Sequence, residues 1–112
     1  MKLVVCGGRY EILTPGRQKW LWRFIVENDC REVVTGGCRG IDREVHAWAD
    51  TNLLNAKVFE ADFANLGRSA GPRRNAEMAA YGDLLVAFPG GRGTADMVRK
   101  MTAAGKRVAR AE

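Results

Sequence analysis

The chain has 112 residues, is 46% hydrophobic and carries a formal net charge of +5. This length suits one compact domain over residues 1–112 and is short for two separate cores. No apolar run approaches the ~20 residues of a membrane span, and the N-terminal segment lacks the apolar core of a signal peptide, so we expect a cytoplasmic protein without membrane contact. The cysteines, Cys6, Cys30 and Cys38, have no CxxC spacing, and we expect reduced thiols, no metal and no cofactor.

Many of the positive charges are arginines that lie in or beside glycine-containing turns. These are Arg9, Arg39, Arg68, Arg73, Arg74 and Arg92. Arginine binds phosphate through paired hydrogen bonds. The sequence has no long block of Lys and Arg and no cluster of aromatic residues suited to base stacking. We therefore expect a small phosphorylated ligand and not nucleic acid.

The first predicted unit is a strand, a glycine turn and a helix. Lys2–Cys6 is a short apolar run that ends in Gly7-Gly8-Arg9, as a buried strand opening into a turn would. Thr14 and Pro15 then predict a helix start, with threonine as the cap and proline at the first helical position.

A second unit repeats this order. Glu32–Thr35 is the next predicted strand, and the turn Gly36–Gly40 leads into a helix that begins near Ile41. Asp42 lies in the first turn of this helix, where a carboxylate either complements the helix dipole or accepts hydrogen bonds from ribose hydroxyls. His46 is the only histidine and has no spaced metal ligands, so we interpret it as structural.

A third strand is predicted over Ala56–Ala61. The following segment, Asp62–Pro72, is predicted to be a loop, and its small polar residues suit ligand binding. The next helix opens at Pro72–Asn75, which places two arginines in its first turn. Positive charge is unfavourable at a helix N-terminus unless an anion binds there.

The most informative stretch comes near the C-terminus. Asp83–Phe88 is an apolar run that stops at a proline and three glycines, and Thr94 is the predicted cap of the helix that follows. Glycine lets backbone N–H groups approach a phosphate closely, and a helix N-terminus carries partial positive charge. A tight turn without any ligand is the alternative interpretation. Ala104 is predicted to face inward, and Lys106–Ala111 is a last, more polar strand.

The order of elements is therefore βαβαβαβαβ. Alternating strands and helices predict an α/β protein: a single Rossmann-like domain with a parallel five-stranded sheet and helices on both faces. Ligands of such sheets bind at the carboxyl ends of the strands, where the strand order reverses. All three glycine turns are predicted to lie on that side.

Three segments in order, Thr35–Asp42, Ala70–Met78 and Ala87–Thr94, together with Gly7–Arg9, resemble the YspA-like branch (DUF2493) of the SLOG superfamily. The resemblance covers nearly the whole chain. It implies a Rossmann-like fold and a nucleotide-derived, ADP-ribose-like ligand.

The same superfamily includes the LOG phosphoribohydrolases, which resemble the so-called lysine decarboxylases and carry the motif PGGxGTxxE. Pro89, Gly90, Gly91, Gly93 and Thr94 match this motif, but Met97 stands at its glutamate. Arg74 matches the arginine that supports N-glycosidic cleavage in those enzymes. A thioether can neither donate a proton nor activate water, so an enzyme would need Asp96 or Glu77 instead.

We therefore predict a nucleotide-binding protein or sensor, with a nucleoside 5′-monophosphate N-glycosidase (phosphoribohydrolase) as the alternative, in which Arg74 would be catalytic. Phosphate is expected on the turn Gly90–Thr94, and ribose or base toward Gly7, Arg9, Gly37 and Asp42. The predicted ligand-binding residues are Gly7, Gly8, Arg9, Gly36, Gly37, Arg39, Asp42, Arg73, Arg74, Asn75, Pro89, Gly90, Gly91, Arg92, Gly93 and Thr94.

We also expect a homo-oligomer, specifically a dimer, because a domain this small gains by covering apolar helix surface and the related LOG proteins are dimeric. Trp20 and Trp22 point to different sides of the first predicted helix, and this helix is the candidate contact.

Overall fold

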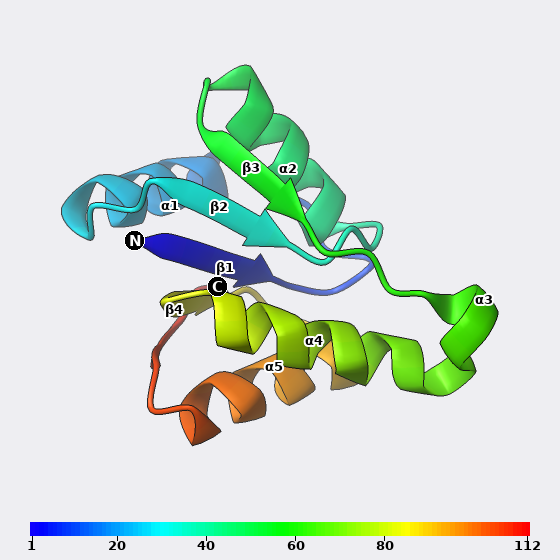
Figure 1. Ribbon diagram of the computed structural model, residues 1–112. Coiled ribbons are helices and arrows are strands. Elements are labelled where there is room, and N and C mark those ends of the chain that lie inside the picture. Colours follow the sequence, from blue (N-terminus) through cyan, green and yellow to red (C-terminus); the bar gives the residue numbers. More distant parts are fainter.

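The computed structural model describes residues 1–112, with strands and helices in strict alternation apart from one short insertion (Figure 1). The elements are β1 (Lys2–Cys6), α1 (Pro15–Glu27), β2 (Glu32–Thr35), α2 (Ile41–Thr51), β3 (Asn55–Val58), α3 (Phe63–Leu66), a 3-10 turn η1 (Gly67–Ser69), α4 (Ala70–Tyr81), β4 (Leu84–Ala87), α5 (Arg92–Ala103) and β5 (Arg107–Arg110).

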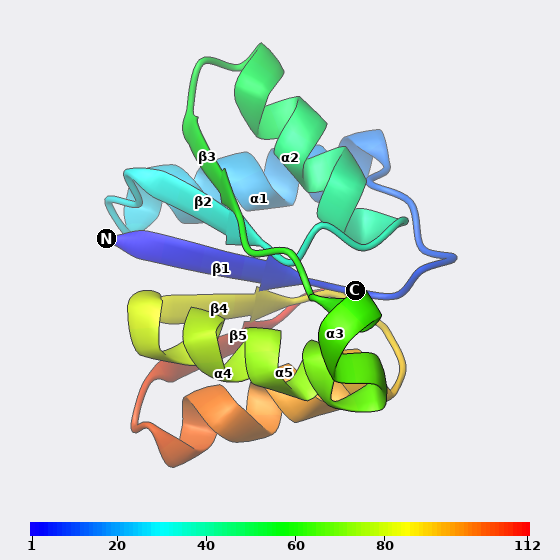
Figure 2. The same cartoon turned by 45° about the vertical axis from the view of Figure 1, so that its right-hand side comes forward.

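The five strands form one parallel sheet in the order β3-β2-β1-β4-β5. Helices α1 and α2 cover one face, and α4 and α5 cover the other (Figures 1 and 2). The chain moves outward from β1 to β3 and then returns to the other side of β1 for β4. The strand order therefore reverses between β1 and β4, the place where open α/β sheets bind ligands.

Alternation along β1 divides the core into two layers. Leu3 and Val5 pack toward α1 and α2, whereas Val4 and Cys6 pack toward α4 and α5. Strands β1 and β4 are buried on both faces, which is why they are continuous apolar runs rather than alternating ones.

The predicted fold class, a single Rossmann-like domain with a parallel five-stranded sheet, is confirmed. The predicted helix cap at Thr14 is also confirmed, since the Thr14 side chain accepts a hydrogen bond from Arg17 N at 3.2 Å.

Element boundaries differ from the prediction in the second half. The predicted loop contains α3 and η1, because Asp62 caps the short helix by accepting from Asn65 N at 3.2 Å. The third strand ends at Val58. Helix α4 begins at Ala70, since proline is tolerated in a first turn whose N–H groups lack helical partners. The arginines of α4 consequently lie beyond its first three positions.

Helix α5 also begins earlier than expected. Gly91 is its N-cap, without a side-chain cap, so the prediction that Thr94 caps the helix is wrong. Thr94 lies inside the first turn and is buried. Ala104, predicted to face inward, is exposed after the helix end.

The longest helix, α1, has 13 residues, and no helix combines the length and apolar composition needed to cross a bilayer.

Candidate functional site

A cavity of about 1130 Å³ opens at the carboxyl ends of β1 and β4. Its walls come from the β1–α1 loop, the start of α2, the α3–α4 segment and the β4–α5 turn. Figure 1 shows α3 beyond the tips of the strand arrows, on this side of the sheet. Most predicted ligand-binding residues line the cavity: Gly7, Gly8, Arg9, Asp42, Arg74, Asn75, Pro89, Gly90, Gly91, Arg92, Gly93 and Thr94.

Backbone contacts join the turns on either side of the cavity. Gly8 N donates to Pro89 O at 2.8 Å, and Gly8 O accepts from Ile41 N at 3.3 Å. A Cβ on Gly90 would lie 2.2 Å from Thr94 Oγ1, and a Cβ on Gly40, whose φ is +86°, would lie 2.4 Å from Gly8 O. Glycine is therefore required at Gly90 and Gly40 by packing, before any ligand is considered.

The first turn of α5 offers backbone N–H groups to the cavity, and its glycines are not required by packing. The first N–H bonded within this turn is that of Ala95, which donates to Gly91 O at 3.1 Å. By their position, the N–H groups of Arg92, Gly93 and Thr94 have no helical acceptor, and all three residues line the cavity. Added Cβ atoms on Gly91 and Gly93 would meet nothing within 4 Å. These donors can therefore serve an anion in the cavity.

Arg74 is only 9% exposed, and the protein fixes its guanidinium on three sides. Its Nη1 donates to Gly36 O, its Nη2 contacts Cys38 Sγ at 3.6 Å, and its Nε donates to Asn75 Oδ1 at 3.1 Å. Three donor groups are thus anchored while the side chain still lines the cavity. Arg74 supplies a fixed positive charge rather than a mobile one.

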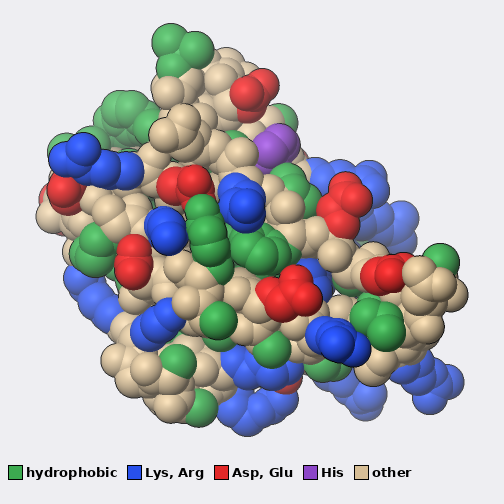
Figure 3. All heavy atoms as spheres, in the orientation of Figure 1, with side chains coloured by type: hydrophobic (Ala, Val, Ile, Leu, Met, Phe, Trp, Pro, Cys, Tyr) green, Lys and Arg blue, Asp and Glu red, His purple; other side chains and the backbone are tan.

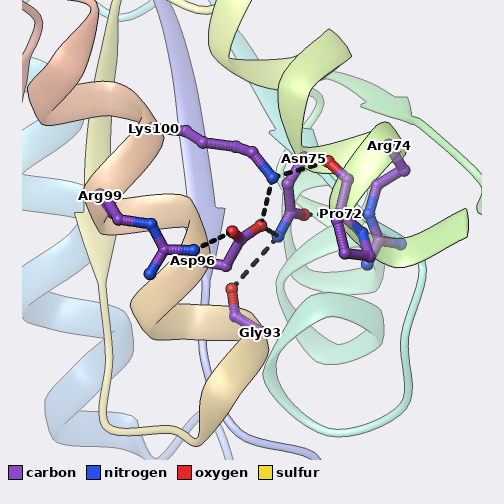
Figure 4. A network of polar contacts seen from close by, with 7 residues as sticks. All are labelled: Pro72, Arg74, Asn75, Gly93, Asp96, Arg99 and Lys100. Atoms are coloured by element: carbon purple, nitrogen blue, oxygen red, sulfur yellow. Dashed lines mark hydrogen bonds and ion pairs between the residues drawn. The ribbon is translucent and has the colours of Figure 1, made fainter. Parts of the chain in front are cut away.

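Asn75 connects Arg74 to α5 (Figure 4). Its amide nitrogen donates to Gly93 O at 3.2 Å and to Asp96 Oδ2 at 3.0 Å. Asp96 also accepts from Arg99 and from Lys100 Nζ, the latter at 2.7 Å. Burial opposes ionisation of Asp96, but the hydrogen bonds from Lys100 and Asn75 outweigh it and lower its pKa. This network holds the N-terminus of α5 against α4.

Asp42 is the buried acid of the cavity, with 6% of its surface exposed. Its Oδ2 accepts from Cys38 N at 3.4 Å, whereas its Oδ1 is buried without a hydrogen-bond partner. Burial raises the pKa of this carboxyl to about 6, although the N–H groups of Cys38 and Gly36 and the charge of Arg74 act against the rise. A buried acceptor without a partner makes the ionised carboxylate costly, in keeping with the raised pKa.

The remaining predicted residues lie outside the main cavity. Gly36 is buried, and a Cβ there would approach Arg74 Cζ to 2.8 Å, so this glycine makes room for the arginine. Gly37 and Arg39 line a smaller neighbouring hollow of about 350 Å³. Arg73 is exposed on α4 and lines neither space.

The residues matched to the LOG enzymes do not supply a free acid. Met97 is 1% exposed and packs in the core beside Val4 and Met101, so its side chain faces the sheet and not the cavity. Asp96 lines the cavity but is held by Asn75, Arg99 and Lys100. Glu77 is exposed and lines neither space.

Twelve lining residues were not named as individual ligand contacts, although Phe63, Arg68, Gly71 and Pro72 belong to the segment predicted to suit ligand binding. The twelve are Cys6, Tyr10, Glu11, Cys38, Phe63, Arg68, Gly71, Pro72, Met78, Ala95, Asp96 and Arg99. Phe63 and Arg68 reach the cavity from α3 and η1, the short helical turns that form within this segment. Helical spacing from Arg92 would have indicated Asp96 and Arg99, which lie one and two turns farther along α5.

Charged side chains of both signs are interspersed on the face shown in Figure 3, and basic side chains also gather along its lower edge. This face does not present one continuous basic track of the kind that follows a nucleic-acid backbone.

Comparison with known proteins supports the fold. A solved structure of the structural-genomics target TM1055 superposes with a TM-score of 0.75, is 19% identical, and is matched over 96% of this chain and 71% of its own. No family model matches the chain. No curated protein matches it either. The class that these findings define is a Rossmann-like α/β domain with a cavity at its topological switch point.

Proposed function

We propose that the chain binds a nucleotide or nucleotide-derived, ADP-ribose-like ligand as a sensor or binding protein of the SLOG superfamily, in its YspA-like branch. The observation that carries this proposal is the first turn of α5. Its N–H groups without helical acceptors face a cavity at the strand-order reversal, and the added Cβ positions of Gly91 and Gly93 are open. This arrangement suits a phosphate group.

The other cavity residues suit the rest of such a ligand. Arg92 is exposed beside the turn and can pair with phosphate, while Arg74 adds a fixed charge. Asp42 lines the cavity, where a carboxylate can accept from a ribose hydroxyl. Phe63 and Tyr10, which are 53% and 85% exposed, offer aromatic faces to a base at the cavity rim.

Replacement of Gly91 by alanine tests the phosphate position. The new methyl group would meet no protein atom, so stability should stay within about 0.5 kcal/mol of wild type. Titration calorimetry with AMP and ADP-ribose should show affinity lowered at least about tenfold, because the methyl group occupies the approach to the N–H groups.

Gly16→Ala is the matched control, since its Cβ also meets nothing within 4 Å and Gly16 lies in α1, away from the cavity. This variant should bind like wild type. Unchanged affinity in folded Gly91→Ala would remove the α5 turn from the ligand site.

A second candidate is N-glycosidic hydrolysis of a nucleoside 5′-monophosphate, and Asp42 is the observation that favours it. A buried carboxyl with a pKa of about 6 suits general acid catalysis. Asp42 would protonate the leaving base nitrogen as the C1′–N bond breaks; water would add its oxygen to C1′ and return a proton to the carboxylate. Release of ribose 5-phosphate from AMP by wild type, lost in Asp42→Asn, supports this activity, and tight binding without release excludes it for AMP.

A further inference from the structure

The smaller hollow beside the main cavity gathers three arginines from two neighbouring loops and a helix. Arg9 comes from the β1–α1 loop, Arg39 from the turn before α2, and Arg43 from the first turn of α2. Glu60 is the one carboxylate that lines it. The hollow therefore has an excess of positive charge.

None of these guanidinium groups is neutralised within the protein. The ion pairs of the chain involve Arg17, Arg31, Arg99 and Lys100, so Glu60 does not pair with any arginine of the hollow. Arg39 lies over the Tyr10 ring, with its Cζ 5.7 Å from the ring centroid. That contact orients the side chain and leaves its donors free.

The hollow adjoins the main cavity. Arg9, Cys38 and Phe63 line both spaces. Asp42, which is expected to hold a ribose hydroxyl, lies on the main-cavity side of this boundary and is hydrogen-bonded to Cys38 N. A ribose bound at Asp42 would have the α5 turn on its main-cavity side, and Arg39 and Arg43 on the side of the hollow.

We propose that this hollow is a second phosphate subsite, so that the ligand is a nucleotide with two phosphate groups on different ribose oxygens. The inference rests on the proposed function, because the first phosphate occupies the turn of α5. Each of the two phosphates then has its own donors: backbone N–H groups at α5, and guanidinium groups at the hollow.

Calorimetry at physiological salt with AMP, ADP and adenosine 3′,5′-bisphosphate tests the subsite. The bisphosphate should bind wild type about tenfold more tightly than AMP, and ADP should not share this gain, since its phosphates are contiguous. Arg43→Gln should remove most of the gain for the bisphosphate and leave AMP affinity within about twofold. Arg23→Gln, which removes an exposed charge from α1, is the matched control and should bind all three as wild type does.

Equal affinity for AMP and the bisphosphate overturns the second subsite alone, provided that Gly91→Ala still weakens AMP. ADP binding as tightly as the bisphosphate also overturns it, as does an equal loss of AMP and bisphosphate affinity in Arg43→Gln. A wild-type protein that binds none of the three nucleotides overturns both the subsite and the proposed function.

Discussion

At the residue scale, Asp42 connects the electrostatics of the cavity with the stability of the fold. Its carboxyl has a pKa raised from 3.8 to about 6 by burial. Below about pH 3 the group is neutral in both folded and unfolded chains. As the pH rises toward 6, the unfolded chain loses this proton first, so the free energy of unfolding decreases.

We therefore expect wild type to lose stability relative to Asp42→Asn between about pH 3 and about pH 7, by roughly 3 kcal/mol, the free-energy equivalent of the pKa shift. Asparagine keeps an acceptor for Cys38 N but does not ionise. Urea unfolding of both proteins across this range measures the difference. If the free energies of unfolding of the two proteins change with pH in the same way, the Asp42 carboxyl is not buried in the folded protein.

Individual site residues could be predicted where a glycine turn follows a strand. Carboxyl ends of parallel strands meet at one edge of the sheet, so the turns after β1 and β4 had to come together. The roles within a turn could not be predicted in the same way. Gly36 looked like a phosphate contact but makes room for Arg74, and only the three-dimensional packing shows the 2.8 Å approach.

At the scale of elements, the boundaries of α5 decide what Met97 can do. The sequence predicted Thr94 as the cap of this helix. Because the helix starts at Arg92 with Gly91 as its cap, Thr94 is an interior residue and Met97 faces the core. Glycine-rich turns lack the side chains that mark a helix start, which is why the sequence alone placed the cap three residues late.

Met97→Glu should therefore destabilise the protein by at least about 3 kcal/mol, since it buries an unpaired carboxylate among Val4, Met78 and Met101. It should create no phosphoribohydrolase activity. Met97→Leu, which conserves volume, should cost less than about 1.5 kcal/mol. A stable Met97→Glu protein that releases ribose 5-phosphate would contradict this assignment of the side chain to the core.

At the scale of the whole molecule, α1 leaves apolar surface uncovered. Trp22 and Val26, one turn apart, are 45% and 63% exposed, and the Trp22 ring packs edge-on against Trp48 of α2 with centroids 6.1 Å apart. Trp20 is 39% exposed and stacks on Phe24. Both tryptophans of α1 are thus accessible to solvent. Helix α1 lies on the face of the sheet opposite to α4 and α5.

We propose that this α1 surface is the contact of a homodimer. Tryptophan is enriched at the centre of protein interfaces, and a two-fold axis would place Trp22 of each copy near the other.

Light scattering at a concentration on the order of tens of micromolar should therefore give the dimer mass for wild type. Trp22→Glu should shift the mass toward the monomer, because a charge would be buried at the contact. Arg73→Glu, an exposed charge change on α4 at the other face of the sheet, is the control and should leave the mass unchanged. If wild type scatters as a monomer at this concentration, the exposed tryptophans belong to the surface of a single domain, and the ligand site must function without a second copy.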